Sequence, residues 1–201
     1  MILMAELKIV TKGSRYFIYI DDRKMGFLYA SDLKRIGLSD GQELDDVAVD
    51  ELRDIMYRRT YNKACSYLES SEYCGSEIRF KLKHNDFADD MIDRVIDELY
   101  QNRYLDDKRY AEAFIRSYCH TKGRKLIECE LSYKKIDTEI INEAYEAFLS
   151  DVDYDEDGVI EDIIRKKYGS EDLSDIKVKS RIISYFSRRG FDLDKVNNHL
   201  T

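Results

Sequence analysis

Three copies of one helical pattern run along this chain, and this repetition constrains its fold more than any other feature. In each copy two apolar residues four positions apart share a helix face, and a lone apolar residue follows five positions later, ahead of a second amphipathic helix. The lone residues are Phe87, Ile136 and Phe191, so the copies are offset by 49 and 55 residues. A period near 50 predicts a mainly α protein of stacked helical units rather than one compact enzyme core.

The turn inside each copy has a physical basis. The lone apolar residue stands just before the predicted N-cap of the last helix, and the apolar residue five positions on fits a hydrophobic staple. Asp137 and Asp192 can cap that helix, whereas Ala88 is a weak cap. Each copy should therefore bend in the same way.

Residues 6–30 follow a different pattern, with alternating apolar residues interrupted by turn residues at 12–14 and 21–23. This pattern predicts a small antiparallel β-sheet, which needs a packing partner to be stable. One long helix should run from Val47 to about Ser70. The predicted organisation is an elongated array of tandem three-helix, helix-turn-helix-like repeats behind the sheet, with an N-terminal sheet extension at 1–46, repeat 1 at 47–105, repeat 2 at 106–150, and an acidic linker plus repeat 3 at 151–201.

Composition narrows the class of protein. Charged residues make up 37 % and the mean hydropathy is -0.56, which fits thin units with narrow buried stripes. No run of about 18 apolar residues is present, so we expect no membrane span. The start, Met1 to Glu6, is too short for a secretory signal. We expect a monomer in the cytoplasm.

Catalytic and metal sites are not indicated. The four cysteines and three histidines lack the spacing of a closed zinc site, and no nucleophile–base or phosphate-loop motif occurs. Asp153, Asp155, Asp157 and Gly158 match positions 1, 3, 5 and 6 of an EF-hand loop, but position 12 is Ile164 instead of a bidentate Glu. A solvated acidic connector is the favoured interpretation, and calcium binding is the alternative. We expect no catalytic residues, no metal and no cofactor.

Charge is unevenly distributed. The chain has a net charge of -8, yet the second helix of each repeat is basic, with net charges of +2, +3 and +5 over 77–85, 122–135 and 177–189. Like charges gathered on one surface indicate a partner, although cations also favour helix C-termini. The candidate partner-binding residues are Arg79, Lys81, Lys83, Arg124, Lys125, Lys134, Lys135, Arg181, Arg188 and Arg189.

The three-helix units also resemble helix-turn-helix modules, which place a second helix in a DNA groove. The basic helices hold few amides, so phosphate contact with single-stranded or duplex DNA is favoured over sequence reading. This leaves a stand-alone DNA-binding array, acting on transcription or nucleoid structure, as the alternative function. The acidic chain as a whole argues against it.

Two segments resemble the signature of RecX regulatory proteins. They are Ser76-Glu77-Ile78-Arg79-Phe80-Lys81-Leu82 and Tyr104-Leu105-Asp106-Asp107-Lys108-Arg109-Tyr110-Ala111. The match is strongest over about 64–150. The turn glycine of the family is kept at Gly190, whereas Asp86 and Lys135 replace it in the first two copies and would have to adopt the left-handed conformation.

The resemblance implies a non-enzymatic regulator of the RecA recombinase. RecX-like proteins are elongated helical arrays that lie in the groove of the RecA filament on DNA, limit filament growth and so restrain recombination, strand exchange and ATPase activity in DNA repair and the SOS response. The basic helices would then face the filament groove while the acidic remainder faces solvent.

Overall fold

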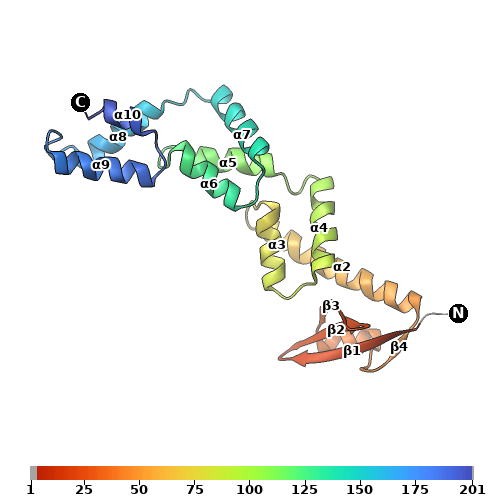
Figure 1. Ribbon diagram of the computed structural model, residues 1–201. Helices are drawn as coiled ribbons and strands as arrows, with labels where there is room; N and C mark the ends of the chain where they lie inside the picture. The colour runs from red at the N-terminus through yellow and green to blue at the C-terminus, as the bar shows by residue number, and fades with distance from the viewer. Residues whose placement is uncertain (1–3, 201) are drawn as a thin grey trace. The chain divides into compact units, whose positions relative to one another are not determined.

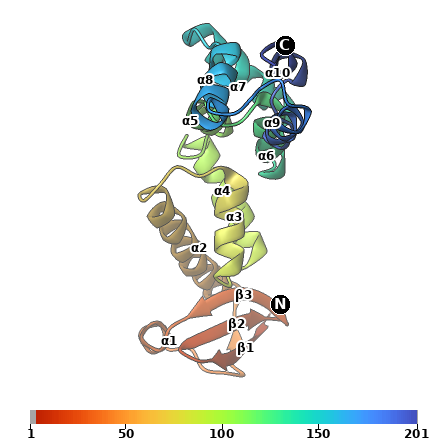
Figure 2. The same ribbon diagram turned by 90° about the vertical axis from the view of Figure 1, so that its left-hand side faces the viewer.

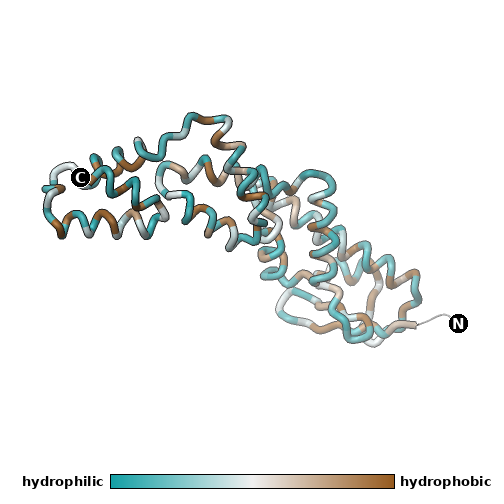
Figure 3. Tube along the Cα trace, turned by 45° about the horizontal axis from the view of Figure 1, so that its top comes forward, coloured by the Kyte–Doolittle hydropathy of each residue, from teal (hydrophilic) through white to brown (hydrophobic). Residues whose placement is uncertain are grey.

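The computed structural model describes residues 4–200. Residues 1–3, which belong to the segment that we tested for a secretory signal, lie outside the described part. The chain divides into two compact units, Met1–Asp106 and Asp107–Thr201, which we call unit 1 and unit 2. Unit 1 holds the sheet and the first three-helix group, and unit 2 holds the second and third groups (Figure 1). Apolar residues recur along every helix between polar ones, as the repeat pattern requires (Figure 3).

The sheet of unit 1 is antiparallel, with strand order β3-β2-β1-β4. The β1–β2 turn contains Gly13 at φ +61°, and the β2–β3 turn contains Asp21 and Asp22, also at positive φ. The sequence predicted the first three strands and both turns, but not the two-residue β4. A short helix, α1 (Ala30–Ile36), ends at Gly37 with φ +77°. The strands are β1 Ala5–Lys12, β2 Arg15–Ile20, β3 Arg23–Leu28 and β4 Glu43–Leu44.

The sheet packs against helix α2 (Asp46–Leu68), which begins where the Asp45 carboxylate accepts a hydrogen bond from Ala48 N at 2.8 Å. Leu7 and Ile18 from the sheet share one core with Leu52 and Met56 from α2. Burying each such side chain contributes about 1.5–3 kcal/mol, which supplies the packing partner that the small sheet needs. Figure 2 shows the sheet lying across the ends of α2 and its neighbouring helices.

Repeat 1 consists of α2, α3 (Gly75–His84) and α4 (Asp89–Gln101). Unit 2 continues with α5 (Asp107–Tyr118), α6 (Arg124–Tyr133) and α7 (Thr138–Asp151), followed by α8 (Glu156–Tyr168), α9 (Ile176–Arg188) and α10 (Leu193–Asn198). The apolar residues of the repeat pattern form the cores of these groups. In the third group, for example, Ile182, Phe186, Phe191 and Val196 are all at most 1 % exposed.

The second helix of every group ends in the same Schellman turn. Residue Asp86, Lys135 or Gly190 is left-handed there, with φ of 69°, 64° and 76°. The next residue then donates its backbone N–H to the carbonyl five positions earlier, as Phe191 N does to Phe186 O at 3.2 Å. The left-handed exits expected at Asp86 and Lys135 are thereby confirmed. Of the two predicted aspartate caps, Asp192 accepts from Asp194 N at 3.0 Å, whereas the exposed Asp137 carboxylate makes no capping bond.

The acidic segment predicted as a linker over 151–157 is shorter than expected. Helix α7 continues to Asp151 and α8 begins at Glu156, so Asp157 and Gly158 lie in the first turn of α8. A helical Gly158 cannot provide the sharp turn of an EF-hand loop, and these residues do not form one. Acidic residues in a first helical turn are stabilised by the helix dipole, which accounts for the cluster.

No helix within residues 4–200 is both long enough and apolar enough to cross a membrane.

Candidate partner-binding surface

The predicted cations of α3 are partly neutralised by α4. Arg79 pairs with Asp93, and the Lys83 amine lies 3.1 Å from the Asp89 carboxylate. Both pairs are exposed, so each contributes at most about 1 kcal/mol to stability. They nevertheless place carboxylates beside the cations, so the surface around α3 is less positive than its sequence suggested.

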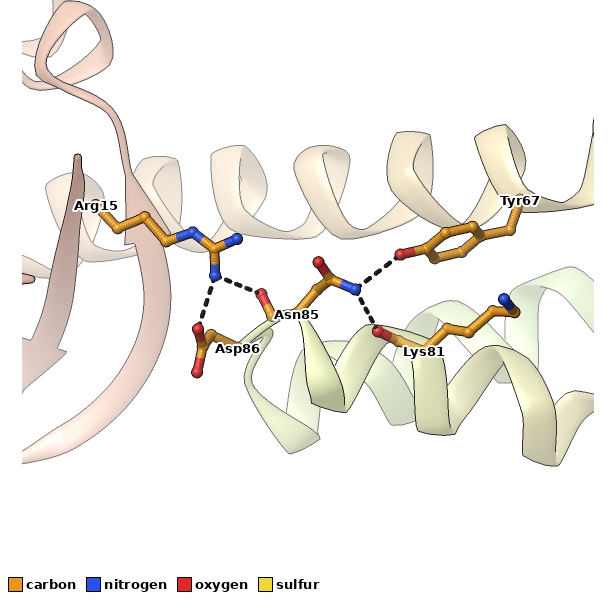
Figure 4. A network of polar contacts seen from close by, with 5 residues as sticks. All are labelled: Arg15, Tyr67, Lys81, Asn85 and Asp86. Carbon is orange, nitrogen blue, oxygen red and sulfur yellow. Dashed lines mark hydrogen bonds and ion pairs between the residues drawn. The ribbon is translucent and has the colours of Figure 1, made fainter. Parts of the chain in front are cut away.

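Lys81 is held by aromatic rings instead of acids. Its amine lies 4.6 Å from the ring centroid of Tyr73 and 5.2 Å from that of Tyr67. The Tyr67 hydroxyl also accepts a hydrogen bond from Asn85 Nδ2 at 2.9 Å, and the same amide donates to the Lys81 carbonyl at 2.9 Å (Figure 4). The tyrosine therefore fixes both the end of α3 and the lysine above it.

Arg15 connects this network to the sheet. Its guanidinium donates to the Asp86 carboxylate at 2.7 Å and to the Asn85 carbonyl at 3.3 Å (Figure 4). Asp86 is the left-handed residue of the turn, so a residue that replaces the turn glycine also anchors the sheet. Aspartate suits both tasks, because it tolerates the left-handed conformation better than most residues and its carboxylate accepts from Arg15.

In unit 2 the start of α6 meets the end of α9 directly. Gly123 N donates to Arg189 O at 2.8 Å, and Lys125 N donates to Gly190 O at 3.3 Å. A Cβ on Gly123 would lie within 3.0 Å of backbone atoms of Gly190 and Phe191, so only glycine permits this approach. We call residues 122–125 and 188–191 the α6–α9 junction. Backbone N–H groups at the start of α6, which have no partner within that helix, donate hydrogen bonds to carbonyl groups at the end of α9. The contact therefore pairs groups at both helix ends that would otherwise lack a partner in their own helix.

The α6–α9 junction brings four predicted cations together. Lys125 and Arg188 are exposed and form no ion pair within residues 4–200. Arg124 pairs with Glu128 at 2.6 Å and lies over the Tyr145 ring at 4.6 Å. Arg189 donates to the Thr121 carbonyl at 2.9 Å and lies 4.8 Å from the Tyr185 ring centroid, so it joins the two repeats as well as adding charge.

The remaining predicted residues lie elsewhere on unit 2. The Lys134 amine lies 5.5 Å from the Tyr110 ring centroid, and Lys135 is the exposed left-handed residue of its turn. Arg181 pairs with Glu171 near the start of α9. Lys122, which counted toward the charge of 122–135 but was not among the predicted contact residues, belongs to the junction. Its amine lies 3.9 Å from the Tyr118 ring and 2.6 Å from the Glu130 carboxylate.

Sequence reasoning also missed two exposed aromatic residues on the second helices. Phe80 on α3 is 71 % exposed and stacks on His84, and Tyr133 at the end of α6 is 87 % exposed. Both fall outside the apolar stripe of their helix, which is the signal that could have revealed them. His84 and Tyr133 are also equivalent positions, since they are 49 residues apart. A large ring in solvent beside lysines is a feature of binding surfaces.

The polar cavity of unit 2 does not resemble a catalytic site. About 350 Å³ in volume, it is lined by Tyr145 and Tyr154 together with Lys122, Glu156 and Lys195. Burial raises the pKa of both tyrosines well above 10.0, so both phenols are neutral. The Tyr154 hydroxyl donates to the Cys119 carbonyl at 2.9 Å, which is a structural role. Within residues 4–200 no group of three His, Cys, Asp or Glu side chains could hold a metal ion.

Consecutive three-helix groups with basic second helices define a helical-repeat protein whose surfaces serve recognition. Comparison with known proteins gives the particular family. The profile described as RecX, first three-helix domain, matches residues 61–99, and that of the second three-helix domain matches 106–144. Both ranges fall on the repeats described above.

Relatives and a solved structure agree with these matches. Regulatory protein RecX of Bacillus velezensis is 30% identical over 188 residues, which cover 91% of this chain and 70% of the relative. Regulatory protein RecX of Clostridium acetobutylicum is 30% identical over 200 residues, which cover 94% of this chain and 90% of the relative. A crystal structure of a regulatory protein RecX is 20% identical to this chain and superposes with a TM-score of 0.63. The superposition covers 98% of this chain and 100% of the chain in the crystal structure, so the two have the same fold. The chain belongs to the RecX family of regulatory proteins, and the resemblance found in the sequence is confirmed.

Proposed function

We propose that this chain binds the RecA recombinase or its filament on DNA and inhibits recombination, strand exchange and the RecA ATPase. Membership of a family of regulatory proteins supports this proposal. The α6–α9 junction carries it, because this acidic chain exposes Lys125 and Arg188 there and neither forms an ion pair within residues 4–200. A filament on DNA presents phosphates and carboxylates to such a surface. The protein would act in the cytoplasm as a monomer.

The proposed contact residues are the ten cations of the second-helix segments that the sequence analysis selected. Lys125 and Arg188 are the strongest candidates, because both are exposed and unpaired within residues 4–200. Arg189 also holds the two repeats together, so replacing it would change the fold and the charge at once. That the basic helices of all three repeats face the same side of the array stays a prediction.

The test is a RecA ATPase assay on single-stranded DNA with increasing amounts of the chain. The wild-type chain should lower the rate. The Lys125→Glu/Arg188→Glu double variant should need at least about tenfold more protein for the same inhibition, since two favourable contacts become repulsive. The matched control is Arg165→Glu/Lys166→Glu, which makes the same charge change on exposed α8. Equal inhibition by both double variants would refute the proposed surface, and no inhibition by the wild-type chain would refute the function.

The second candidate function is a stand-alone DNA-binding array that acts as a transcription or nucleoid regulator. The exposed rings of Phe80 and Tyr133 beside lysines favour it. A gel shift on bare DNA at rising salt, without RecA, separates the two functions. Tight binding with a steep salt dependence and no effect on the RecA ATPase would support the DNA-binding array.

A further inference from the structure

A second surface that bears cations lies in unit 1, next to Lys81, which shares the Tyr67 ring with Lys63. Arg15 and Arg59 are paired there with Asp86 and Asp32. This surface is a groove of about 470 Å³ between the sheet, the middle of α2 and the α3–α4 turn. Arg15 and Tyr29 border it on the sheet side, and Arg59 and Lys63 border it on α2. Its volume falls within the range of ligand-binding sites in proteins.

Four polar residues of α2 face this groove at helical spacing. Arg59, Asn62, Lys63 and Ser66 occupy positions i, i+3, i+4 and i+7, so they form one face of the helix. They extend over about 10 Å of helix, which lets them contact successive groups of an extended ligand. Lys63 lies 4.6 Å from the Tyr67 ring centroid and forms no ion pair with any residue from 4 to 200.

Arg59 carries the most specific signal. Its Nη1 donates to the Asp32 carboxylate at 2.8 Å, while its Nε is buried and has no hydrogen-bond partner among residues 4–200. A buried charged donor without a partner costs about 1–3 kcal/mol or more. The Nε atom itself is covered, but the Arg59 side chain is 25 % exposed and lines the groove, so its accessible part can meet a phosphate or carboxylate oxygen there.

The groove also offers aromatic surface. The Tyr29 ring is 41 % exposed and carries the Arg59 guanidinium 5.1 Å from its centroid. Phe27 lies behind it, with Arg15 at 4.5 Å and Arg59 at 5.3 Å from its centroid. Proteins that bind single-stranded nucleic acid combine cations that follow the backbone with rings on which bases stack. An acidic peptide would use the cations but would not need the exposed ring.

We propose that this groove binds single-stranded nucleic acid, with phosphate oxygens on Arg59 and Lys63 and one base stacked on Tyr29. Asn62 then offers its amide group to the base edge or the sugar, whereas the Asn85 Nδ2 already donates to Tyr67 and Lys81. Duplex DNA is a poorer ligand because its bases are already stacked on each other. The proposal goes beyond the proposed function, since it requires no RecA and uses none of the second-helix cations.

The test measures fluorescence anisotropy of a labelled oligothymidylate of about 15 nucleotides with the full chain, and without RecA. Lys63→Glu should raise the Kd about tenfold or more, because a phosphate contact becomes a repulsion. Tyr29→Leu keeps the apolar bulk but removes the ring, and should raise the Kd at least about fivefold. The control, Arg58→Glu, makes the same charge change at an exposed α2 position outside the groove and should change the Kd less than about threefold.

Three further measurements decide between the possible ligands. A matched duplex should bind at least about ten times more weakly, and polyglutamate of equal charge should not displace the oligonucleotide. A 5-iodouracil-substituted strand should crosslink to Tyr29 on irradiation, identified by mass spectrometry. An unchanged Kd in both groove variants, displacement by polyglutamate or crosslinks only outside the groove would overturn the proposal. None of these outcomes depends on the RecA ATPase assay, so the two proposals fail independently.

Discussion

Replacing Gly123 by alanine tests whether the α6–α9 junction holds repeats 2 and 3 together. Gly123 has φ -75°, which alanine adopts without strain, so the substitution adds only a methyl group. That methyl group would lie within 3.0 Å of Gly190 O and of Phe191 N and Cα, all of which are backbone atoms that cannot rotate away. The two helices must separate.

The free energy of unfolding should fall by about 3 kcal/mol. Separation breaks the hydrogen bonds from Gly123 N to Arg189 O and from Lys125 N to Gly190 O, each worth about 0.5–1.5 kcal/mol. Overpacking by the methyl group adds about 1–3 kcal/mol to this loss of stability. Alanine also lowers the conformational entropy of the unfolded chain, which reduces the loss by about 0.4–1 kcal/mol. For a unit of this size each kcal/mol shifts Tm by about 4–8 °C, so we expect a decrease of about 12–24 °C.

Differential scanning calorimetry and circular dichroism of the full chain measure this shift. Limited proteolysis should also cut the Gly123→Ala variant first near the junction, because its helices open locally. The control substitution in the same unit is Gly158→Ala. A Tm for Gly123→Ala within about 2 °C of wild type would refute the reasoning, since it would mean that the helices do not touch there.

Four further predictions follow from individual residues. Gly158→Ala should raise stability by about 0.5–1 kcal/mol, because the new methyl group meets only the movable Asp155 carboxylate in a helix that prefers alanine; a decrease in Tm would contradict this. Lys135→Gly should stabilise unit 2 by about 1 kcal/mol in urea denaturation, since glycine relieves the left-handed φ of 64°. Arg189→Ala should cost about 0.5–1.5 kcal/mol by removing the hydrogen bond to the Thr121 carbonyl and the contact with the Tyr185 ring, whereas exposed Arg188→Ala should change stability by less than about 0.5 kcal/mol. Burial raises the pKa of Tyr145 in the folded chain, so its stabilising effect is complete below pH 10 and is lost as the pH rises above 10; Tyr145→Phe should flatten the fall of Tm over that range.

Much of the local structure could be predicted from the sequence. The spacing of apolar residues gave the helices, and turn residues gave the first three strands. The left-handed exits at Asp86 and Lys135 followed from the turn glycine of the family that the chain resembles, and a Schellman turn depends on only six consecutive residues. The acidic segment was predicted less accurately. Its carboxylates resembled calcium ligands in a linker, but the apolar periodicity of the following residues extends α8 back to Glu156.

The candidate surface was only partly predictable. Sequence reasoning selected basic residues by their place on the second helices, and it could not separate exposed Lys125 from Arg79, whose charge Asp93 neutralises. It also overlooked Tyr29 and Arg59, which lie in different segments of the chain and become neighbours only through packing of the sheet on α2. Ion pairs and grooves of this kind depend on side chains that are distant in sequence.

The sequence by itself determined the three-helix repeat, its turn and the family, because each is encoded by short-range spacing of apolar, capping and turn residues. Only the tertiary structure decided that Gly123 and Gly190 touch, that Arg189 binds the Thr121 carbonyl and that the sheet rests on α2. Contacts between residues 67 or 68 positions apart follow from how whole helices pack, and no local pattern in the chain specifies that packing.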